Sequence, residues 1–395
     1  MNEIKNIHVD RDELLQFLQK LISINSVNPS LGTEGKGELE IAHYIGDVLR
    51  GMGLEVRFQE LGTNRVNVIG VLKGTGGGRS LMLNGHMDTV TARSMHIEPF
   101  VPSFRDGDVY GRGALDMKGG IAAQVMAVQA IIRSGIRLQG DVIIAGVADE
   151  EYVSMGTEAL LKEYITDGAV VCEPTDLQIV TAHKGFVWST IEIMGRAAHG
   201  SMPEKGIDAI MKAGKVLAIL DGFDWAVLSG RTHPLLGNPS LHASLIQGGT
   251  EWSTYPDYCK IQLERRTIPN ELPEDIDEEY RYLLKKIAEE DRLFVASYRR
   301  DYYRQPFEIS RSSDIVLTLE RAARYVLGKE PVIAGASFWM DTALLAAAGI
   351  PTVNFGPAGD GLHAAEEYVD FDSVVTTAEV LVRFIIEFCN GEGIH

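Results

Sequence analysis

Residues 80–88 read SLMLNGHMD, and this stretch decides the fold. The apolar run over 80–84 predicts a strand buried on both faces, which is typical of a parallel sheet covered by helices. His86 and Asp88 follow this strand directly. Ligands of open α/β sheets bind beyond the carboxyl ends of the strands, so these two residues stand where a site is expected. Asp88 also has the spacing to orient the ring of His86.

Strands and helices alternate on both sides of this stretch. Short apolar runs predict further strands over residues 54–58, 66–72, 141–148, 168–172 and 350–355. Apolar residues at helical spacing predict helices over residues 11–23, 37–51, 119–134, 313–327, 340–348 and 371–389. The alternation predicts an α/β fold with a mixed, mainly parallel sheet that is flanked by helices.

The middle of the chain has a different pattern. Strand-like runs cover residues 185–195, 242–247, 257–266 and 293–302, and helical spacing covers residues 205–220 and 274–290. This set predicts a separate α+β layer with a four-stranded sheet. We therefore expect one discontinuous domain made of residues 1–184 and 304–395, with a second domain of residues 185–303 inserted into it.

Composition and charge narrow the class of function. The 395 residues contain 37 Lys and Arg against 55 Asp and Glu, a net charge of −18. A surface this acidic repels phosphate backbones, so no nucleic-acid partner is expected. No apolar run approaches the ~18 residues that cross a bilayer, and the first residues lack a signal-peptide core. Three widely spaced cysteines favour a reducing compartment, so we expect a cytoplasmic protein with no membrane partner.

Residues that can bind a metal ion stand at the ends of the predicted elements. They are Asp116 in GRGALDMKGG, Glu150 and Glu151 in DEE, Glu173 in CEPT, and His363 in GPAGDGLHAAEE. Each has an ordinary explanation when it is taken alone. A lone histidine is more often structural, Asp116 has the position of a helix N-cap, and consecutive acidic residues are common in solvated loops.

Taken together, these residues predict a hydrolytic metal site. Consecutive carboxylates at the end of a buried strand repel one another and need a cation, a proton or solvent to compensate them. Histidines and carboxylates without thiolates form a nitrogen and oxygen ligand set that suits Zn, Co or Mn. A carboxylate that bridges two cations is a common way to build a dinuclear hydrolytic site.

The order of the motifs is also that of a known family. HMD, GALDMKGG, DEE, CEPT, GRAAHGSMP and a glycine-rich loop with a histidine follow one another between about residue 10 and the C-terminus. In this order the chain resembles the M20 metallopeptidases, the group of acetylornithine deacetylase, succinyl-diaminopimelate desuccinylase, glutamate carboxypeptidase and aminoacylase-1. The resemblance implies two divalent metal ions as cofactors, Zn with Co or Mn as alternatives.

The resemblance also implies a role for each matching residue. The metal ligands would be His86, Asp116 and Glu173 for one ion, and Asp116, Glu151 and His363 for the other. Asp116 would thus bridge the two ions. Glu150 would be the general base that acts on the bridging water, and Asp88 would orient His86. The peptide bond between Asp116 and Met117 is expected to be cis.

The inserted domain would be the family's lid and the interface of a homodimer. His199, in GRAAHG, would reach the active site of the partner subunit and stabilise the oxyanion there. Arg266 would bind a substrate carboxylate, because a planar guanidinium suits two parallel hydrogen bonds. Its neighbour Arg265 is the alternative for this role.

One segment departs from the family pattern. The segment 251–257 reads EWSTYPD, with Ser253 where the family usually has an asparagine that contacts the substrate. Trp252 and Tyr255 beside it favour either an apolar pocket or packing within the lid. The departure sets this chain apart from the best-known deacetylases.

These roles predict a dinuclear metal-dependent amidohydrolase. It would cleave the amide bond of an N-acyl amino acid, in the manner of acetylornithine deacetylase, by a metal-activated water with Glu150 as general base. One alternative is an M20 dipeptidase or carboxypeptidase that acts on short peptides. Another, from a different class, is a catalytically inactive relative that only binds a ligand.

Overall fold

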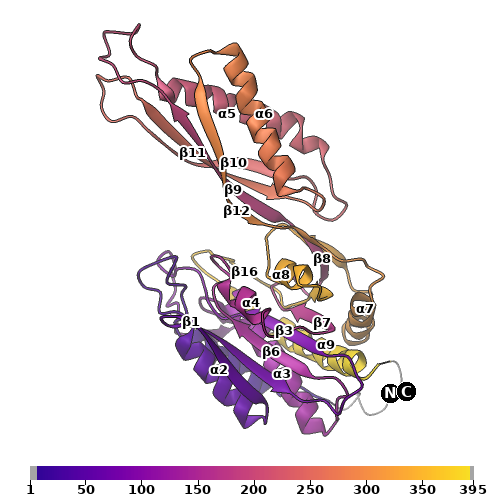
Figure 1. Cartoon of the computed structure of the whole chain (residues 1–395). Helices are drawn as coiled ribbons and strands as arrows, with labels where there is room; N and C mark the ends of the chain where they lie inside the picture. Colours follow the sequence, from indigo (N-terminus) through magenta and orange to yellow (C-terminus); the bar gives the residue numbers. More distant parts are fainter. Residues whose placement is uncertain (1–6, 392–395) are drawn as a thin grey trace. The chain divides into compact units, whose positions relative to one another are not determined.

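The computed structural model describes residues 7–391, apart from the side chains of residues 224–226. The outermost parts of the predicted discontinuous domain, residues 1–6 and 392–395, lie outside the described residues. The described chain divides by its internal contacts into two compact units, here called unit 1 and unit 2 (Figure 1). Unit 1 contains Met1–Thr181, Ile309–Ala334 and Met340–His395, and unit 2 contains Ala182–Glu308 and Gly335–Trp339.

The larger, mixed sheet has the strand order β1-β2-β6-β3-β7-β15-β8-β13, with β14 beside β8, and all of it except β13 and the ends of β8 and β14 belongs to unit 1. Its strands are β1 (Glu55–Gly62), β2 (Arg65–Leu72), β3 (Leu81–His86), β6 (Val142–Val147), β7 (Gly168–Val171), β8 (Ile179–His183), β13 (Phe307–Glu308), β14 (Ile333–Ala336) and β15 (Thr352–Asn354). The central strands β6, β3, β7 and β15 pair in parallel. β1 and β2 add to one side as an antiparallel pair. The predicted mixed sheet is confirmed, and its parallel pairs are the buried central ones.

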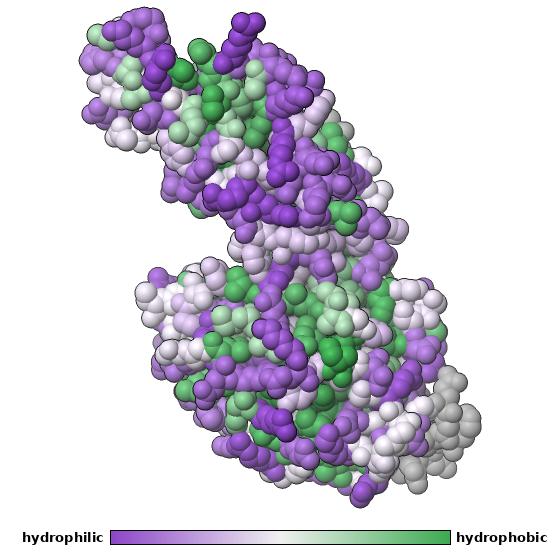
Figure 2. Space-filling view, viewed as in Figure 1, coloured by the Kyte–Doolittle hydropathy of each residue, from purple (hydrophilic) through white to green (hydrophobic). Residues whose placement is uncertain are grey.

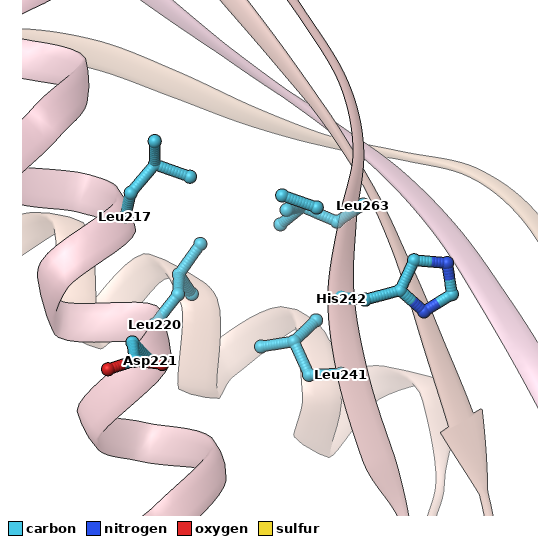
Figure 3. Close-up of a pocket in the computed structure, with 7 residues that line it drawn as sticks. Leu217, Leu220, Asp221, Leu241, His242 and Leu263 are labelled. Atoms are coloured by element: carbon cyan, nitrogen blue, oxygen red, sulfur yellow. The ribbon is translucent and has the colours of Figure 1, made fainter.

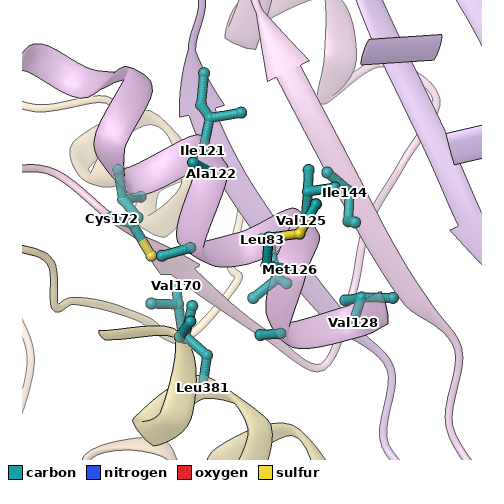
Figure 4. Close-up of a cluster of buried hydrophobic side chains, with 14 of the residues drawn as sticks. Leu83, Ile121, Ala122, Val125, Met126, Val128, Ile144, Val170, Cys172 and Leu381 are labelled. Carbon is teal, nitrogen blue, oxygen red and sulfur yellow. The ribbon is translucent and has the colours of Figure 1, made fainter. Parts of the chain in front are cut away.

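Helices flank this sheet and enclose its core. They are α1 (Arg11–Ser23), α2 (Leu39–Gly51), the π-helical segment η2 (Ala114–Lys118), α3 (Gly119–Ser134), α4 (Met155–Leu160), α7 (Asp314–Leu327), α8 (Thr342–Ala347) and α9 (Phe371–Asn390). α3 packs against α9, and α4 packs against α8. In the core, Leu83 and Val170 of the strands lie beside Val125 of α3 and Leu381 of α9 (Figure 4).

A second, small sheet in unit 1 has the strand order β16-β17-β5-β4. Its strands are β4 (Ser103–Arg105), β5 (Asp108–Tyr110), β16 (Gly359–Asp360) and β17 (Tyr368–Asp370). β17 pairs with β5 through Val369 opposite Val109. This pairing fixes the loop between β16 and β17 to a part of the chain that is distant in sequence. No sequence pattern predicted this sheet, because strands of two or three residues show no periodicity.

Unit 2 contains a four-stranded antiparallel sheet with the order β10-β11-β9-β12. Its elements are β9 (Gly185–Met194), α5 (Ala209–Ala226), the 3-10 helix η3 (Leu228–Gly230), β10 (Ser240–Gly248), β11 (Tyr258–Thr267), α6 (Pro273–Glu290) and β12 (Val295–Arg304). Alternate strand residues such as Ile191 and Ile261 are buried against Val216 of α5 and Leu284 of α6. The predicted four-stranded sheet is confirmed.

The visible face of each unit is mostly hydrophilic, with hydrophobic side chains scattered among the polar ones (Figure 2). This surface agrees with the net charge of −18. Within residues 7–391, no helix is both long enough and apolar enough to span a membrane.

Candidate metal centre

The strand order of unit 1 brings the candidate ligands to one edge of its sheet. β6, β3 and β7 are parallel neighbours, so their carboxyl ends meet. His86 ends β3, Glu150 and Glu151 follow β6, and Glu173 follows β7. All three strands are buried along their whole length, and the acidic side chains appear only after the strands end.

Two further candidate ligands come from segments outside the large sheet. Asp116 lies in η2, where its φ of −114° and ψ of 95° depart from helical geometry. The peptide bond between Asp116 and Met117 is cis, as the resemblance implied. His363 lies in the loop between β16 and β17, with a positive φ of 58°.

The carboxylate of Asp116 lies between the two histidines. Its Oδ1 is 2.9 Å from Nε2 of His86, and its Oδ2 is 3.2 Å from Nε2 of His363. Nε2 of His363 is also 3.3 Å from Oε2 of Glu151, and Nε2 of His86 is 3.5 Å from Oε1 of Glu173. The two oxygens of Asp116 therefore face different partners, which is the arrangement of a carboxylate that bridges two cations.

The donor atoms fit divalent cations. Two overlapping sets offer ligand atoms within 4.8 Å of one another, namely His86, Asp116 and Glu151, and His86, Glu150 and Glu173. Glu150, the predicted base, thus lies among the predicted ligands. Oε1 of Glu151 is buried and has no hydrogen-bond partner among the described residues. A buried carboxylate oxygen without a partner is costly, and a bound cation removes that cost.

The carboxylates of the cluster have opposite electrostatic surroundings. Burial raises the pKa of Glu150 and of Glu173 well above the ordinary value of a glutamate. Burial and the charge of Asp116 raise the pKa of Glu151 to about 7. Burial opposes ionisation of Asp116 as well, but its contacts with the two histidines outweigh burial and lower its pKa. Asp116 is therefore the carboxylate of the cluster that stays ionised most readily.

The same carboxylates raise the pKa values of the two histidines and so favour their charged forms. Burial alone lowers the pKa of His86, but the charges of Glu173 and Asp116 outweigh it and hold the pKa well above the ordinary value. Hydrogen bonds with Asp116 and Glu151 raise the pKa of His363 to about 10. A divalent cation that binds these histidines must displace a proton from each of them.

Asp88 joins two parts of the site. Nδ1 of His86 lies 3.0 Å from the backbone carbonyl oxygen of Asp88 and 3.7 Å from its carboxylate. The carboxylate accepts hydrogen bonds from the backbone N–H groups of Glu150 and Glu151, at 3.1 and 3.3 Å. It also accepts one from Nδ2 of Asn28 at 2.8 Å. Asp88 thus contacts His86 through its carbonyl group and holds the glutamate turn through its carboxylate.

A buried ion-pair network behind this turn was missed by the sequence reasoning. Asp149, with a φ of 73°, accepts hydrogen bonds from Nη2 of Arg65 at 2.6 Å and from Nδ2 of Asn28 at 3.0 Å. Nε of Arg65 also donates to Glu38 at 2.8 Å. All three charged residues are buried. The one available signal was an arginine, Arg65, at the first position of the otherwise apolar strand β2.

His199 belongs to unit 2, and its role towards the metal centre stays a prediction. It lies in the loop after β9 and forms an isolated bridge with Thr254 of the loop after β10. The backbone carbonyl of Ser253 accepts a hydrogen bond from Gly200 at 2.7 Å, so the two loops are tied together. Trp252 on the second loop is fully exposed, so it does not pack within unit 2.

Arg266 and Arg265 have different surroundings on β11. Arg265 is fully buried and forms ion pairs with Glu271 and Glu279. Arg266 is partly exposed, and its Nε donates to Glu264 at 2.6 Å. Its two terminal nitrogens have no hydrogen-bond partner among the described residues. Of the two arginines, Arg266 is the one that can reach a ligand, and its role stays a prediction.

A pocket of about 300 Å³ in unit 2 contains none of the predicted site residues. It lies between α5 and β10 and is lined by Leu217, Leu220, Asp221, Leu241, His242, Ala243 and Leu263. The leucine side chains face one another across it, and the ring of His242 points away (Figure 3). The pocket is therefore an apolar hollow beside β10.

The chain is similar in sequence and in fold to known proteins. The sequence profile of the family described as Peptidase family M20/M25/M40 matches residues 82–387. The chain is 27% identical over 420 aligned positions to N-formyl-4-amino-5-aminomethyl-2-methylpyrimidine deformylase of Bacillus subtilis, covering 98% of this chain and 97% of that protein. It is 28% identical over 338 positions to acetylornithine deacetylase of Myxococcus xanthus, covering 84% and 86%. The crystal structure of aminopeptidase PepT from Bacillus cereus has the same fold, with a TM-score of 0.81, 24% identity, and coverage of 96% and 99%.

Proposed function

The chain belongs to peptidase family M20/M25/M40, and from this premise we propose that it is a dinuclear metal-dependent amidohydrolase that cleaves the amide bond of an N-acyl amino acid. One observation carries the proposal. The two oxygens of Asp116 lie 2.9 and 3.2 Å from Nε2 of His86 and His363, with glutamates on both sides. A buried carboxylate with a nitrogen ligand beside each oxygen suits a pair of cations.

The proposed ligands follow from these contacts. They are His86, Asp116 and Glu173 for one ion, and Asp116, Glu151 and His363 for the other. When bound, two divalent ions polarise an amide carbonyl and lower the pKa of water towards neutrality. The nitrogen and oxygen donors suit Zn, with Co or Mn as alternatives.

Glu150 is proposed to move the proton. Its carboxylate takes a proton from the attacking water and then gives it to the leaving amine. Burial that raises the pKa of Glu150 suits a group that holds a proton between these two steps. The backbone of Glu150 is fixed by Asp88, so its position does not depend on the substrate.

Residues of unit 2 are proposed to complete the site. His199 donates to the oxyanion that forms on the attacked carbonyl, and Arg266 binds the carboxylate of the substrate through its terminal nitrogens. The two named relatives act on an N-formyl and an N-acetyl compound, which favours acyl-amide hydrolysis over peptide cleavage. A short peptide with a free carboxylate is the second candidate substrate.

We also propose a homodimer formed through unit 2, in the cytoplasm. β10 is an edge strand, and it exposes Leu245 and Ile246 beside the apolar hollow. α5 exposes Ile210 and Met211 near its N-terminus. An edge strand with exposed apolar side chains is a surface that a second copy can extend. The cytoplasmic location is supported by the three cysteines, which are all free and buried.

A substrate panel tests the proposed reaction. Zn-loaded protein is assayed with N-acetyl amino acids and with dipeptides of the same side chains, and the same samples with excess chelator serve as blanks. We expect chelator-sensitive hydrolysis of the N-acetyl compounds and little cleavage of the dipeptides. Cleavage of the dipeptides alone would support the peptidase alternative. A protein that binds metal and cleaves neither would be an inactive relative.

A further inference from the structure

Glu367 is a buried carboxylate that the proposed chemistry does not use. It is 1% exposed and stands next to the exposed Glu366, in the loop that carries His363. Its charge is balanced by Arg112, which is equally buried, with Nη1 at 2.8 Å from Oε2 of Glu367. A buried ion pair of this kind adds little stability over an apolar pair of the same volume, so stability alone does not account for it.

The side-chain hydrogen bonds of Glu367 all come from residues 112–116. Oε2 accepts from the backbone N–H of Gly113 at 3.0 Å, in addition to Arg112. Oε1 accepts from the backbone N–H groups of Leu115 and of Asp116, at 3.0 and 3.2 Å. Three backbone donors and one guanidinium therefore converge on one carboxylate.

This segment needs an acceptor from elsewhere in the chain. Gly113 has a φ of 79° and Asp116 has a φ of −114°, so ordinary helical hydrogen bonds do not satisfy their N–H groups. Glu367 supplies the acceptors from the loop of His363. Nη2 of Arg112 adds a second tie to the same loop, because it donates to the carbonyl oxygen of Ala364 at 3.1 Å.

We propose that Glu367, paired with Arg112, is a positioning residue that fixes the carboxylate of Asp116 relative to His363, so that Asp116 can bind two ions at once. The inference rests on the proposed function, since it assumes that Asp116 bridges the metal pair. Glu367 itself lies among backbone donors and binds no ion. Its effect on the ions passes through the backbone of Asp116.

The substitution Glu367→Gln separates this role from simple packing. Glutamine has nearly the same volume, but it has one acceptor oxygen and one NH₂ donor in place of two acceptors. Whichever way the amide lies, its NH₂ group meets two donors, which are either the N–H groups of Leu115 and Asp116 or those of Gly113 and Arg112. The fit of the core is retained while half of the acceptors are lost.

The test measures metal affinity. Zn binding to chelator-treated wild type, E367Q and E366Q is followed by competition with a chromophoric chelator, and Co absorption spectra report the geometry of the site. E366Q is the matched control, because Glu366 is paired with Arg105 at the surface, at 2.6 Å. We expect E367Q to lower the affinity for both ions by about 10- to 100-fold, which is the usual effect of removing a residue that holds a metal ligand in place. E366Q should bind both ions with wild-type affinity.

Two results would overturn the inference. One is an E367Q protein that binds both ions with wild-type affinity. The other is a loss of affinity for only one of the two ions, which would show that Glu367 acts on the His363 loop alone. If circular dichroism shows that E367Q does not fold, E367D is measured instead. Aspartate keeps both acceptor oxygens on a shorter side chain, so we expect a smaller loss of affinity for both ions. Failure of the proposed function is a separate result, namely wild-type protein that binds no metal.

Discussion

Two carboxylates with opposite surroundings define the site at the scale of single residues. Contacts with the two histidines lower the pKa of Asp116 in spite of its burial, and burial raises the pKa of Glu150. Pairs of titratable groups whose pKa values are pushed apart commonly divide the work of a hydrolytic site. Asp116 is suited to stay ionised and bind cations, whereas Glu150 is suited to carry a proton.

Metal affinity is expected to rise with pH. The pKa of His363, raised to about 10, keeps a proton on this ring near neutral pH, and the pKa of His86 is raised as well. Each of these protons must leave before a cation binds, so affinity falls as pH falls. Zn titration of chelator-treated protein in weak buffer with an indicator dye is expected to show proton release. Affinity that stays constant between about pH 6 and 9, with no proton release, would contradict the site.

The two neighbouring arginines of β11 are expected to behave differently when substituted. R266Q should raise KM for N-acyl amino acids by about tenfold or more with little change in kcat, because a hydrogen bond to a charged group contributes about 1.5–3 kcal/mol. R265Q should lower the free energy of unfolding by about 1.5–3 kcal/mol, because it removes charged hydrogen bonds to Glu271 and Glu279, whose pairing with Arg231 remains. Steady-state kinetics and urea unfolding of both variants separate the two effects. The assignment fails if R266Q loses stability while its KM is unchanged.

The clustering of the motif residues at the candidate metal centre could be predicted because each stands at the end of an apolar strand or at the start of a helix. His86, Glu150 and Glu173 are examples. Glu367 and Arg65 could not be assigned, because a carboxylate in a loop and an arginine at the start of a strand show no sign of burial in the sequence. Only the fold brings the donors of residues 112–116 onto Glu367.

At the scale of elements, the parallel strands β6, β3 and β7 bring the proposed ligands together, because a parallel sheet presents all its carboxyl ends at one edge. The predicted helices over 11–23 and 119–134 have the bounds of α1 and α3. Strongly periodic segments of this length are the ones that sequence predicts well. The strands β16 and β17, which flank the loop of His363, are too short for such a pattern.

The proposed homodimer is tested at the edge strand β10. Wild type is expected to elute as a dimer, at about twice the chain mass of 43.3 kDa. The double variant L245K/I246K places two charges on the edge and should elute as a monomer. I165K is the matched control, because Ile165 is an equally exposed apolar residue of unit 1. Light scattering coupled to gel filtration measures the masses.

The outcome of this experiment bears on His199 as well. A monomeric L245K/I246K variant should retain its metal and lose turnover, because His199 then has no partner site to complete. A variant that remains dimeric would place the interface elsewhere, and a monomer with full activity would remove His199 from the role proposed for it.

At the scale of the whole molecule, the proposed chemistry draws on both units. The proposed metal ligands and Glu150 belong to unit 1, and His199 and Arg266 belong to unit 2. The α/β class of the chain and its family could be predicted, because the alternation of elements and the order of the motifs extend over nearly the whole sequence. The substrate could not, because the walls of its binding site depend on side chains that no motif specifies.

The most direct test of the proposed dinuclear site measures metal content and hydrolysis together, on wild type and E150Q. We expect about two ions per chain in both proteins, hydrolysis of an N-acetyl amino acid by wild type, and a loss of turnover of about 10²- to 10⁴-fold in E150Q. Glutamine keeps the volume of Glu150 but cannot take up the proton. Wild-type protein that holds no metal under replete conditions, or E150Q that turns over as fast as wild type, would contradict the proposed mechanism.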